Sequence, residues 1–178
     1  HELSWHHNIN EVAVGDVCFL LGCSQIMREE IRSRNKINLV VHESDLPKGK
    51  GWSPLTWQII EGKKNIPITL FEANSSIDSG MIYEKILIST NGTELIDELR
   101  ELQANATSKL ILNFIKKYPK IDGNKQFGDS SFYRKRRSHC HMMASLLTSP
   151  LLLLARRPLA HMTASSRAGT LYRKWESN

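Results

Sequence analysis

Short continuous runs of apolar residues, separated by polar and glycine-containing segments, dominate the first half of the chain. Runs of this length, bounded by turn residues, are typical of buried strands. The pattern predicts strands over residues 16–22, 37–42, 66–73 and 81–89.

Apolar residues at helical spacing occur between and after these strands. This spacing predicts helices over residues 24–34, 53–63 and 92–118. Ser24, Ser53 and Thr93 are placed to cap these helices, and Pro54 suits a first helical position. Because strands alternate with helices, we expect the α/β class, with a mostly parallel sheet and flanking helices.

The composition changes beyond residue 138, where isoleucine no longer occurs and Glu176 is the only acidic residue. We therefore expect a main domain over 1–122, a basic and aromatic extension over 123–137, and an atypical tail over 138–178 that is not part of the fold. A basic tail that binds a membrane or nucleic acid is the alternative interpretation of the last segment. The sequence opens at His1, and we expect the first strand of the domain to precede it.

Apolar runs and cysteines bear on the location of the protein. The run SPLLLLA at 149–155 is much shorter than the about 20 residues that cross a bilayer, so no membrane association is expected. Cys18, Cys23 and Cys140 show no metal-type spacing and cannot all pair as disulfides. A reducing, cytoplasmic location is the simplest expectation.

A first candidate for chemistry is His42, which ends a predicted strand directly before a glycine-containing loop. In open α/β sheets, ligands lie beyond the carboxyl ends of strands, which is the position of this histidine. Pro47, Gly49 and Gly51 then lead to the N-terminus of the 53–63 helix, where free N–H groups favour an anion. An ordinary surface loop is the alternative interpretation of this stretch.

A second candidate is Asp78, in the polar loop that follows the 66–73 strand. Because neighbouring strands of a sheet bring their ends together, we expect Asp78 to approach His42. A carboxylate beside an imidazole favours the charged imidazolium and can relay protons. The alternative is a turn-forming aspartate before Ser-Gly.

These residues form an ordered pattern: HESDLPKGKG from His42, then the strand IPITLFEA, then IDSG with Asp78. The pattern resembles the formyltransferase domain of enzymes that use 10-formyltetrahydrofolate, over about residues 16 to 90. In that family a strand ends in Asn and His, and S-x-LP, a glycine-containing loop and an Asp before a Gly follow. The resemblance implies a Rossmann-like formyltransferase fold and formyl transfer to a primary amine, with no metal.

The resemblance also implies roles for individual residues. His42 is expected to donate a hydrogen bond to the oxyanion of a tetrahedral intermediate, and Asp78 to act as its partner and proton relay. Two segments are expected to bind 10-formyltetrahydrofolate, namely Leu21, Gly22, Ser24, Gln25, Ile26, Met27, Asn74, Ser75, Ser76 and Ile77. The amine substrate is expected to contact Ser44, Lys48, Lys50, Gly51 and Trp52.

One departure from the family pattern is Val40, which stands where a catalytic asparagine is usual. Asn38 lies on the same face of the predicted strand but about 13 Å from His42 at strand rise, too far to replace that donor. Either Ser44 or a polar residue of the 74–76 loop supplies the hydrogen bond, or catalysis is weakened.

The resemblance implies that the substrate is the primary amine of a nucleotide-linked amino sugar, with methionyl-tRNA as the alternative acceptor. The stretch 126–137 resembles a segment of sugar-directed relatives in which aromatic and basic residues close the site. The same basic and aromatic residues are also typical of RNA binding. A non-catalytic domain that binds folate or RNA is the remaining alternative, motivated by Val40 and by this segment.

Overall fold

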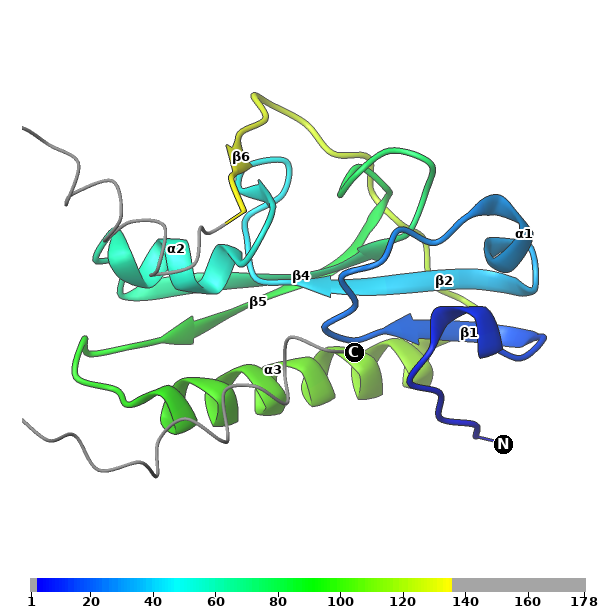
Figure 1. The fold of residues 1–178 in the computed structure, drawn as a ribbon, viewed down its shortest axis with the longest axis horizontal. Helices are drawn as coiled ribbons and strands as arrows, with labels where there is room; N and C mark the ends of the chain where they lie inside the picture. Colours follow the sequence, from blue (N-terminus) through cyan, green and yellow to red (C-terminus); the bar gives the residue numbers. More distant parts are fainter. Residues whose placement is uncertain (1–2, 136–178) are drawn as a thin grey trace, which may run out of the picture. The chain divides into compact units, whose positions relative to one another are not determined.

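The computed structural model describes residues 3–135 of the chain (Figure 1). The elements are the 3-10 helix η1 (Ile9–Glu11), β1 (Gly15–Leu20), α1 (Glu29–Arg32), β2 (Asn35–His42), β3 (Lys50–Gly51), α2 (Pro54–Ile60), β4 (Asn65–Glu72), β5 (Ile82–Ser89), α3 (Ile96–Lys117) and β6 (Phe132–Tyr133). All four predicted strands are confirmed to within two residues at each end. The predicted tail, 138–178, lies outside the described residues.

The main sheet has the order β1-β2-β4-β5. The α/β class with flanking helices is confirmed, and the sheet is mixed: β1 and β2 are parallel, whereas β2–β4 and β4–β5 are antiparallel. The expectation of a mostly parallel sheet thus holds for the β1–β2 pair alone. The physical reason is clearest at β4–β5, because the loop between Glu72 and Ile82 is shorter than the dozen or so residues of a parallel crossover.

The core lies between α3 and one face of the sheet (Figure 1). Leu110 and Phe114 of α3 are fully buried against residues of β2, β4 and β5. The Phe114 ring meets the rings of Phe19 and Tyr83 edge to face, at centroid distances of 6.0 and 5.3 Å. This packing covers one face of the sheet, whereas α1, α2 and the loops that carry the polar candidates lie on the opposite side (Figure 1).

The predicted helix over 24–34 is much shorter in the structure, where α1 spans Glu29–Arg32. Met27 and Ile31 are buried with Leu20 and Ile9 in a second apolar cluster, whereas Ile26 is 68 % exposed. The apolar spacing therefore reflects this cluster rather than a continuous helix. The residues before α1 form a loop that remains free to line a cavity.

Two predicted helix caps are also corrected. The Thr93 hydroxyl donates to the Asn91 side chain, and α3 begins three residues later, where the Glu98 carboxylate accepts from the Leu95 N–H at 2.6 Å. Ser53 precedes α2 in a left-handed conformation, with φ 48°, and makes no side-chain cap. Pro54 occupies the start of α2, as predicted.

No helix within residues 3–135 combines the length and the apolar character needed to cross a membrane.

Candidate active site

His42 is the last residue of β2, and β-pairing places it opposite Thr69 of β4. Its ring is 7 % exposed and lies edge to face with Phe71 at a centroid distance of 6.3 Å. The Nε2 atom lies 2.9 Å from the carbonyl oxygen of Gly49 and 3.6 Å from the Asp78 carboxylate. The expected approach of Asp78 to His42 is confirmed, across an antiparallel sheet rather than a parallel one.

Asp78 lies in the turn between β4 and β5, with a left-handed backbone at φ 48°. Asn74 organises this turn, because its side-chain oxygen accepts from the Ser76 N–H at 3.0 Å and from the Ser79 hydroxyl at 2.9 Å. The Asp78 carboxylate in turn accepts from the backbone N–H of Gly51 at 2.8 Å. Asp78 is thus a turn residue and the partner of His42 at the same time.

The loop that contacts both His42 and Asp78 is held by a segment far along the chain. β3, which is Lys50–Gly51, pairs with β6, which is Phe132–Tyr133. The Gly49 N–H donates to the Ser131 hydroxyl oxygen at 2.9 Å, and the Trp52 N–H donates to the Tyr133 carbonyl at 3.1 Å. A side chain at Gly51 would place its Cβ 2.5 Å from that same carbonyl, so the close pairing requires glycine there.

Tyr133 anchors this pairing to α2. Its ring stacks on Trp57 with a centroid distance of 6.3 Å and an interplanar angle of 10°. The phenol donates to Glu61 at 2.9 Å and accepts from Lys63 at 3.2 Å. Burial, and then the hydrogen bond to Glu61, raises the pKa of Tyr133. The phenol therefore stays un-ionised over the neutral range.

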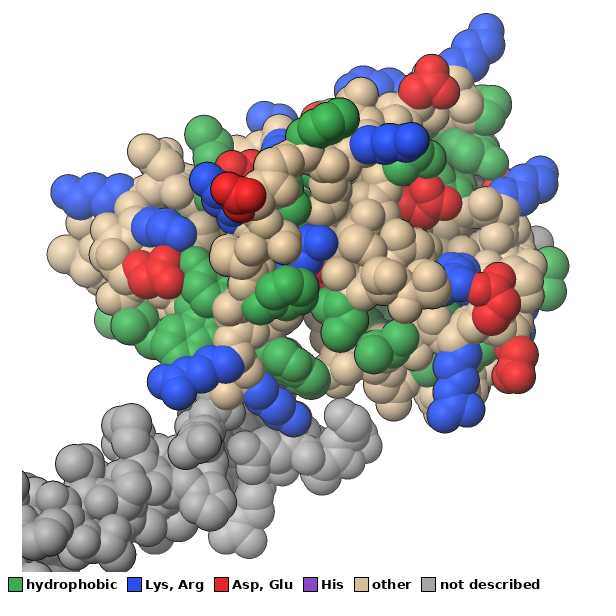
Figure 2. All heavy atoms as spheres, turned by 90° about the horizontal axis from the view of Figure 1, so that it is seen from above, with side chains coloured by type: hydrophobic (Ala, Val, Ile, Leu, Met, Phe, Trp, Pro, Cys, Tyr) green, Lys and Arg blue, Asp and Glu red, His purple; other side chains and the backbone are tan. Residues whose placement is uncertain are grey.

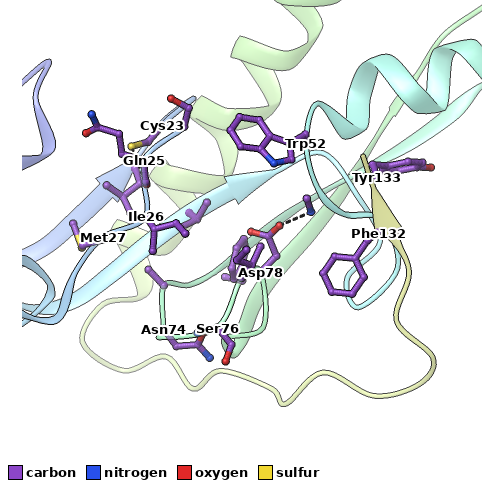
Figure 3. A pocket seen from close by; sticks show the side chains of 17 residues that line it. Cys23, Gln25, Ile26, Met27, Trp52, Asn74, Ser76, Asp78, Phe132 and Tyr133 are labelled. Atoms are coloured by element: carbon purple, nitrogen blue, oxygen red, sulfur yellow. Dashed lines mark hydrogen bonds between the residues drawn. The ribbon is translucent and has the colours of Figure 1, made fainter. Parts of the chain in front are cut away.

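A cavity of about 300 Å³ opens beside Asp78 (Figure 3). Figure 3 shows Cys23, Gln25, Ile26 and Met27 on one side, and Trp52, Phe132 and Tyr133 on the other. The full lining is Leu20, Cys23, Ser24, Gln25, Ile26, Met27, Val40, Gly51, Trp52, Phe71, Ala73, Asn74, Ser76, Ile77, Asp78, Phe132 and Tyr133. In the view of Figure 2, apolar side chains gather on this face among scattered lysine and arginine side chains. A mainly apolar cleft with one carboxylate is suited to a flat organic ligand.

The structure brings most of the predicted folate residues to this cavity. The wall contains Ser24, Gln25, Ile26, Met27, Asn74, Ser76 and Ile77, whereas Leu21, Gly22 and Ser75 lie outside it. Of the predicted amine-binding residues, Gly51 and Trp52 are in the wall, and Ser44, Lys48 and Lys50 are not. Ser44 is only 1 % exposed, because the loop folds over it, so its hydroxyl cannot reach an acceptor from this position.

His42 is likewise absent from the cavity lining, although Asp78, Val40 and Phe71 beside it are present. The imidazole therefore stands behind Asp78 rather than at the surface of the cavity. Val40 occupies the wall where the resemblance places an asparagine. Asn38 does not replace that donor: it is 4 % exposed, and its amide nitrogen donates to the Arg32 carbonyl at 2.8 Å.

Four contributors were missed or only partly foreseen. Phe132 and Tyr133 line the cavity, and two sequence signals pointed to them: the resemblance of 126–137 to a site-closing segment and the basic and aromatic composition typical of RNA binding. The role of the Gly49 carbonyl carried no signal, because it depends on how the loop folds back onto His42. Gln126 lies in the 126–137 stretch, but its contact with the turn of Asp78, 48 residues away, carried no signal of its own. Among residues 3–135, no group of three or more His, Cys, Asp or Glu side chains is placed to hold a metal ion.

This arrangement can move protons. Asp78 faces the cavity with a carboxylate that is 16 % exposed, and a buried imidazole stands directly behind it. A positioned carboxylate–imidazole pair can take a proton from a bound ligand and return it to another atom. The apolar lining strengthens such electrostatic effects by excluding water.

Comparisons with known proteins agree with this geometry. No protein-family model matches the chain. The methionyl-tRNA formyltransferase of Rickettsia canadensis is 29 % identical over 126 residues, which are 70 % of this chain and 41 % of that protein. The solved methionyl-tRNA formyltransferase of Clostridium thermocellum aligns with a TM-score of 0.57 and 26 % identity, over 67 % of this chain and 52 % of that one.

A third relative shares the fold at lower identity. It is an N-formyltransferase from Helicobacter canadensis, solved in complex with folinic acid and dTDP-3-aminofucose. The two structures align with a TM-score of 0.55 and 21 % identity, over 65 % of this chain and 44 % of that one. The chain spans less than half the length of the Rickettsia relative. In sequence and fold, the described part of this chain is therefore similar to part of the formyltransferases.

Proposed function

We propose that this protein transfers a formyl group from 10-formyltetrahydrofolate to the primary amine of a nucleotide-linked amino sugar. The observation that carries the proposal is the pair formed by His42 and Asp78, 3.6 Å apart, with Asp78 on the wall of an apolar cavity. The similarity to formyltransferases supports formyl transfer as the reaction. The site supplies the proton relay that this reaction needs.

Asp78 carries the proton steps in this proposal. The amine nitrogen forms a bond to the formyl carbon, and Asp78 takes the proton that the amine loses, directly or through one water. Asp78 then returns the proton to the departing folate nitrogen as the old carbon–nitrogen bond breaks, so charge and atoms balance. His42, which lies 2.9 Å from the Gly49 carbonyl oxygen and 3.6 Å from the Asp78 carboxylate, stands behind Asp78 and orients its carboxylate for these proton steps.

The folate side of the cavity is formed by the loops before α1 and after β4. Ile26, Met27, Phe71 and Ile77 provide flat apolar contact area. The Asn74 side-chain oxygen is already used within its own turn, so we infer that the backbone of this loop recognises the ring. The folinic acid bound by the Helicobacter canadensis relative supports this assignment.

The opposite side offers aromatic rings with cations over them. Lys135 Nζ lies 4.6 Å from the centroid of Trp52, and Lys50 Nζ lies 5.8 Å from that of Phe132. Trp52 and Phe132 remain 41 % and 65 % exposed, so a base can stack on them while the lysines meet phosphates. This supports a nucleotide-bearing acceptor, and the dTDP-sugar bound by the relative has that chemistry.

Alanine substitution of the pair tests the proposed reaction. His42→Ala and Asp78→Ala are each expected to lower formyl transfer at least about a hundredfold, since both remove the proton relay. Asp97→Ala is the matched control, because Asp97 is 88 % exposed on α3 and bonds only weakly to Arg100 at 3.3 Å. Melting temperatures confirm that each variant folds. Unchanged turnover in either site variant refutes the assignment.

Val40 favours a second candidate, a domain that binds folate or RNA with little or no transfer. An apolar side chain stands in the wall where an amide donor is usual, and His42 lies behind that wall. Calorimetry with folinic acid, followed by transfer assays with dTDP-linked amino sugars and with methionyl-tRNA, separates the candidates. Folate binding without transfer to any acceptor supports the second candidate, and RNA binding without folate binding excludes the first.

A further inference from the structure

The side chain of Gln126 contacts the turn that carries Asp78 from outside the cavity. Its amide nitrogen lies 3.0 Å from the carbonyl oxygen of Asp78 and 2.9 Å from that of Gly80. Because both neighbours can only accept, the NH2 group faces them and both of its hydrogens are used. The bonds connect residues 48 and 46 positions apart in the sequence.

The turn needs such a support. Asp78 holds a left-handed backbone, which is unfavourable for a residue with a side chain. Gly80 approaches the Glu72 carbonyl so closely that a Cβ would lie 1.7 Å from the oxygen. Gln126 donates to the carbonyls of Asp78 and Gly80 in this tight turn, so it stabilises the turn in this conformation.

Gln126 is itself fixed to the sheet. Asn124, two residues earlier, exchanges two backbone hydrogen bonds with Ile82 of β5, each 2.7 Å long. The amide of Gln126 thus extends from a segment bonded to the sheet edge. Its own side-chain oxygen is buried and finds no partner among residues 3–135, so the donor end is the part that makes contacts.

We propose that Gln126 is a positioning residue that sets the direction of the Asp78 carboxylate. The inference rests on the proposed function for its catalytic consequence and deepens it. Gln126 does not touch the cavity, and it acts through the turn: the Asp78 carboxylate meets the Gly51 N–H at 2.8 Å only while the turn keeps its shape. When the two bonds from Gln126 are lost, the carboxylate leaves Gly51 and His42.

The Gly51 amide proton reports this geometry without any need for turnover. The whole 178-residue chain is labelled with ¹⁵N-glycine, and Asp78→Asn gives the chemical shift of the Gly51 amide without a carboxylate partner. Gln126→Leu is expected to move the Gly51 amide proton at least halfway toward the Asp78→Asn value. Phe127→Ala, an 87 % exposed neighbour, is the control and is expected to leave the shift in place.

Gln126→Glu is the second variant, because it keeps the size of the side chain but, when ionised, cannot donate to two carbonyls. It is expected to shift the Gly51 amide in the same direction at neutral pH. An unchanged Gly51 shift in folded variants overturns the proposal. It is also overturned if neither variant folds, because Gln126 is then required for the fold as a whole.

A kinetic comparison separates this inference from the proposed function. Gln126→Leu is expected to lower kcat for formyl transfer about tenfold or more, as displaced catalytic groups do, with the Kd for folinic acid changed less than about threefold. If the wild-type chain transfers no formyl group, the proposed function fails, and the Gly51 shift still decides the role of Gln126.

Discussion

The Nε2 atom of His42 lies 2.9 Å from the carbonyl oxygen of Gly49, seven residues later in the chain. This nitrogen also faces the Asp78 carboxylate at 3.6 Å. Because both neighbours accept hydrogen bonds, Nε2 carries the hydrogen in the neutral ring. The Gly49 carbonyl therefore orients the ring and selects its tautomer, as the carboxylate does in many catalytic histidines.

The first prediction concerns this tautomer. Neutral His42 is expected to be the Nε2–H form, since the Nδ1–H form would direct a lone pair at both oxygens. Long-range ¹H–¹⁵N correlation spectra measure which ring nitrogen holds the proton, and the exposed His6 and His7 provide references within the same chain. A predominantly Nδ1–H form of His42 contradicts the prediction.

The second prediction concerns the wall residue Val40. Val40→Asn is expected to raise formyl transfer about tenfold or more, because an amide there adds a donor for the oxyanion. The same change is expected to lower the free energy of unfolding by about 1–2 kcal/mol, because Val40 packs against the cluster of Leu20 and Met27. Steady-state assays and urea unfolding measure the two effects. Val40→Thr, which has no amide, is the control; an equal gain with threonine argues against the amide as the cause.

The third prediction compares two glycines. Gly80→Ala is expected to cost about 3 kcal/mol in the free energy of unfolding, because the new Cβ would meet the Glu72 carbonyl at 1.7 Å. Gly92→Ala is expected to cost about 1 kcal/mol, because its φ of 94° is strained for alanine but nothing lies within 4 Å. Urea denaturation of both variants gives the difference. If Gly80→Ala and Gly92→Ala lower the free energy of unfolding by similar amounts, the turn of Asp78 relaxes easily around the new side chain.

The fourth prediction is a pH dependence. Burial, with a further contribution from Glu72, raises the pKa of Tyr83 to about 12 from an ordinary value of 10.0. Since the folded form holds the phenol proton more tightly, the associated stability is complete below pH 10 and is lost as the pH rises toward about 12. Unfolding free energies measured across this range are expected to fall, and Tyr83→Phe is expected to reduce the slope. If the dependence of the unfolding free energy on pH is the same in Tyr83→Phe as in the wild type, groups other than Tyr83 cause the loss of stability.

How much of the site could be predicted depends on how far apart in the sequence the interacting residues lie. His42 ends a strand, and Asp78 follows one, and each strand is revealed by its own apolar pattern, so both positions were predicted without coordinates. The residues that hold His42 and Asp78 in position were not predicted. The Gly51–Asp78 bond joins residues 27 positions apart, and the Gly49–Ser131 bond joins residues 82 apart. Local periodicity contains no information about such pairs.

The same distinction explains the errors in secondary structure. The apolar positions Met27 and Ile31 have a helical spacing, yet a helix does not form before Glu29 because Met27 and Ile31 pack into a cluster with residues from other segments. Likewise, strand direction depends on which strands become neighbours. The pairing of β2 with β4, and not the alternation of elements along the chain, made the sheet mixed.

The sequence by itself determined where the strands lie, that His42 ends one strand while Asp78 lies in the loop after another, and which family pattern the two residues resemble. Only the tertiary structure decided that Asp78 lines the cavity while His42 stands behind it, and that the 126–133 segment holds both loops. The physical reason is that strand formation follows from local burial patterns, whereas the direction of a side chain at a site depends on hydrogen bonds between segments that only the order of the sheet brings together.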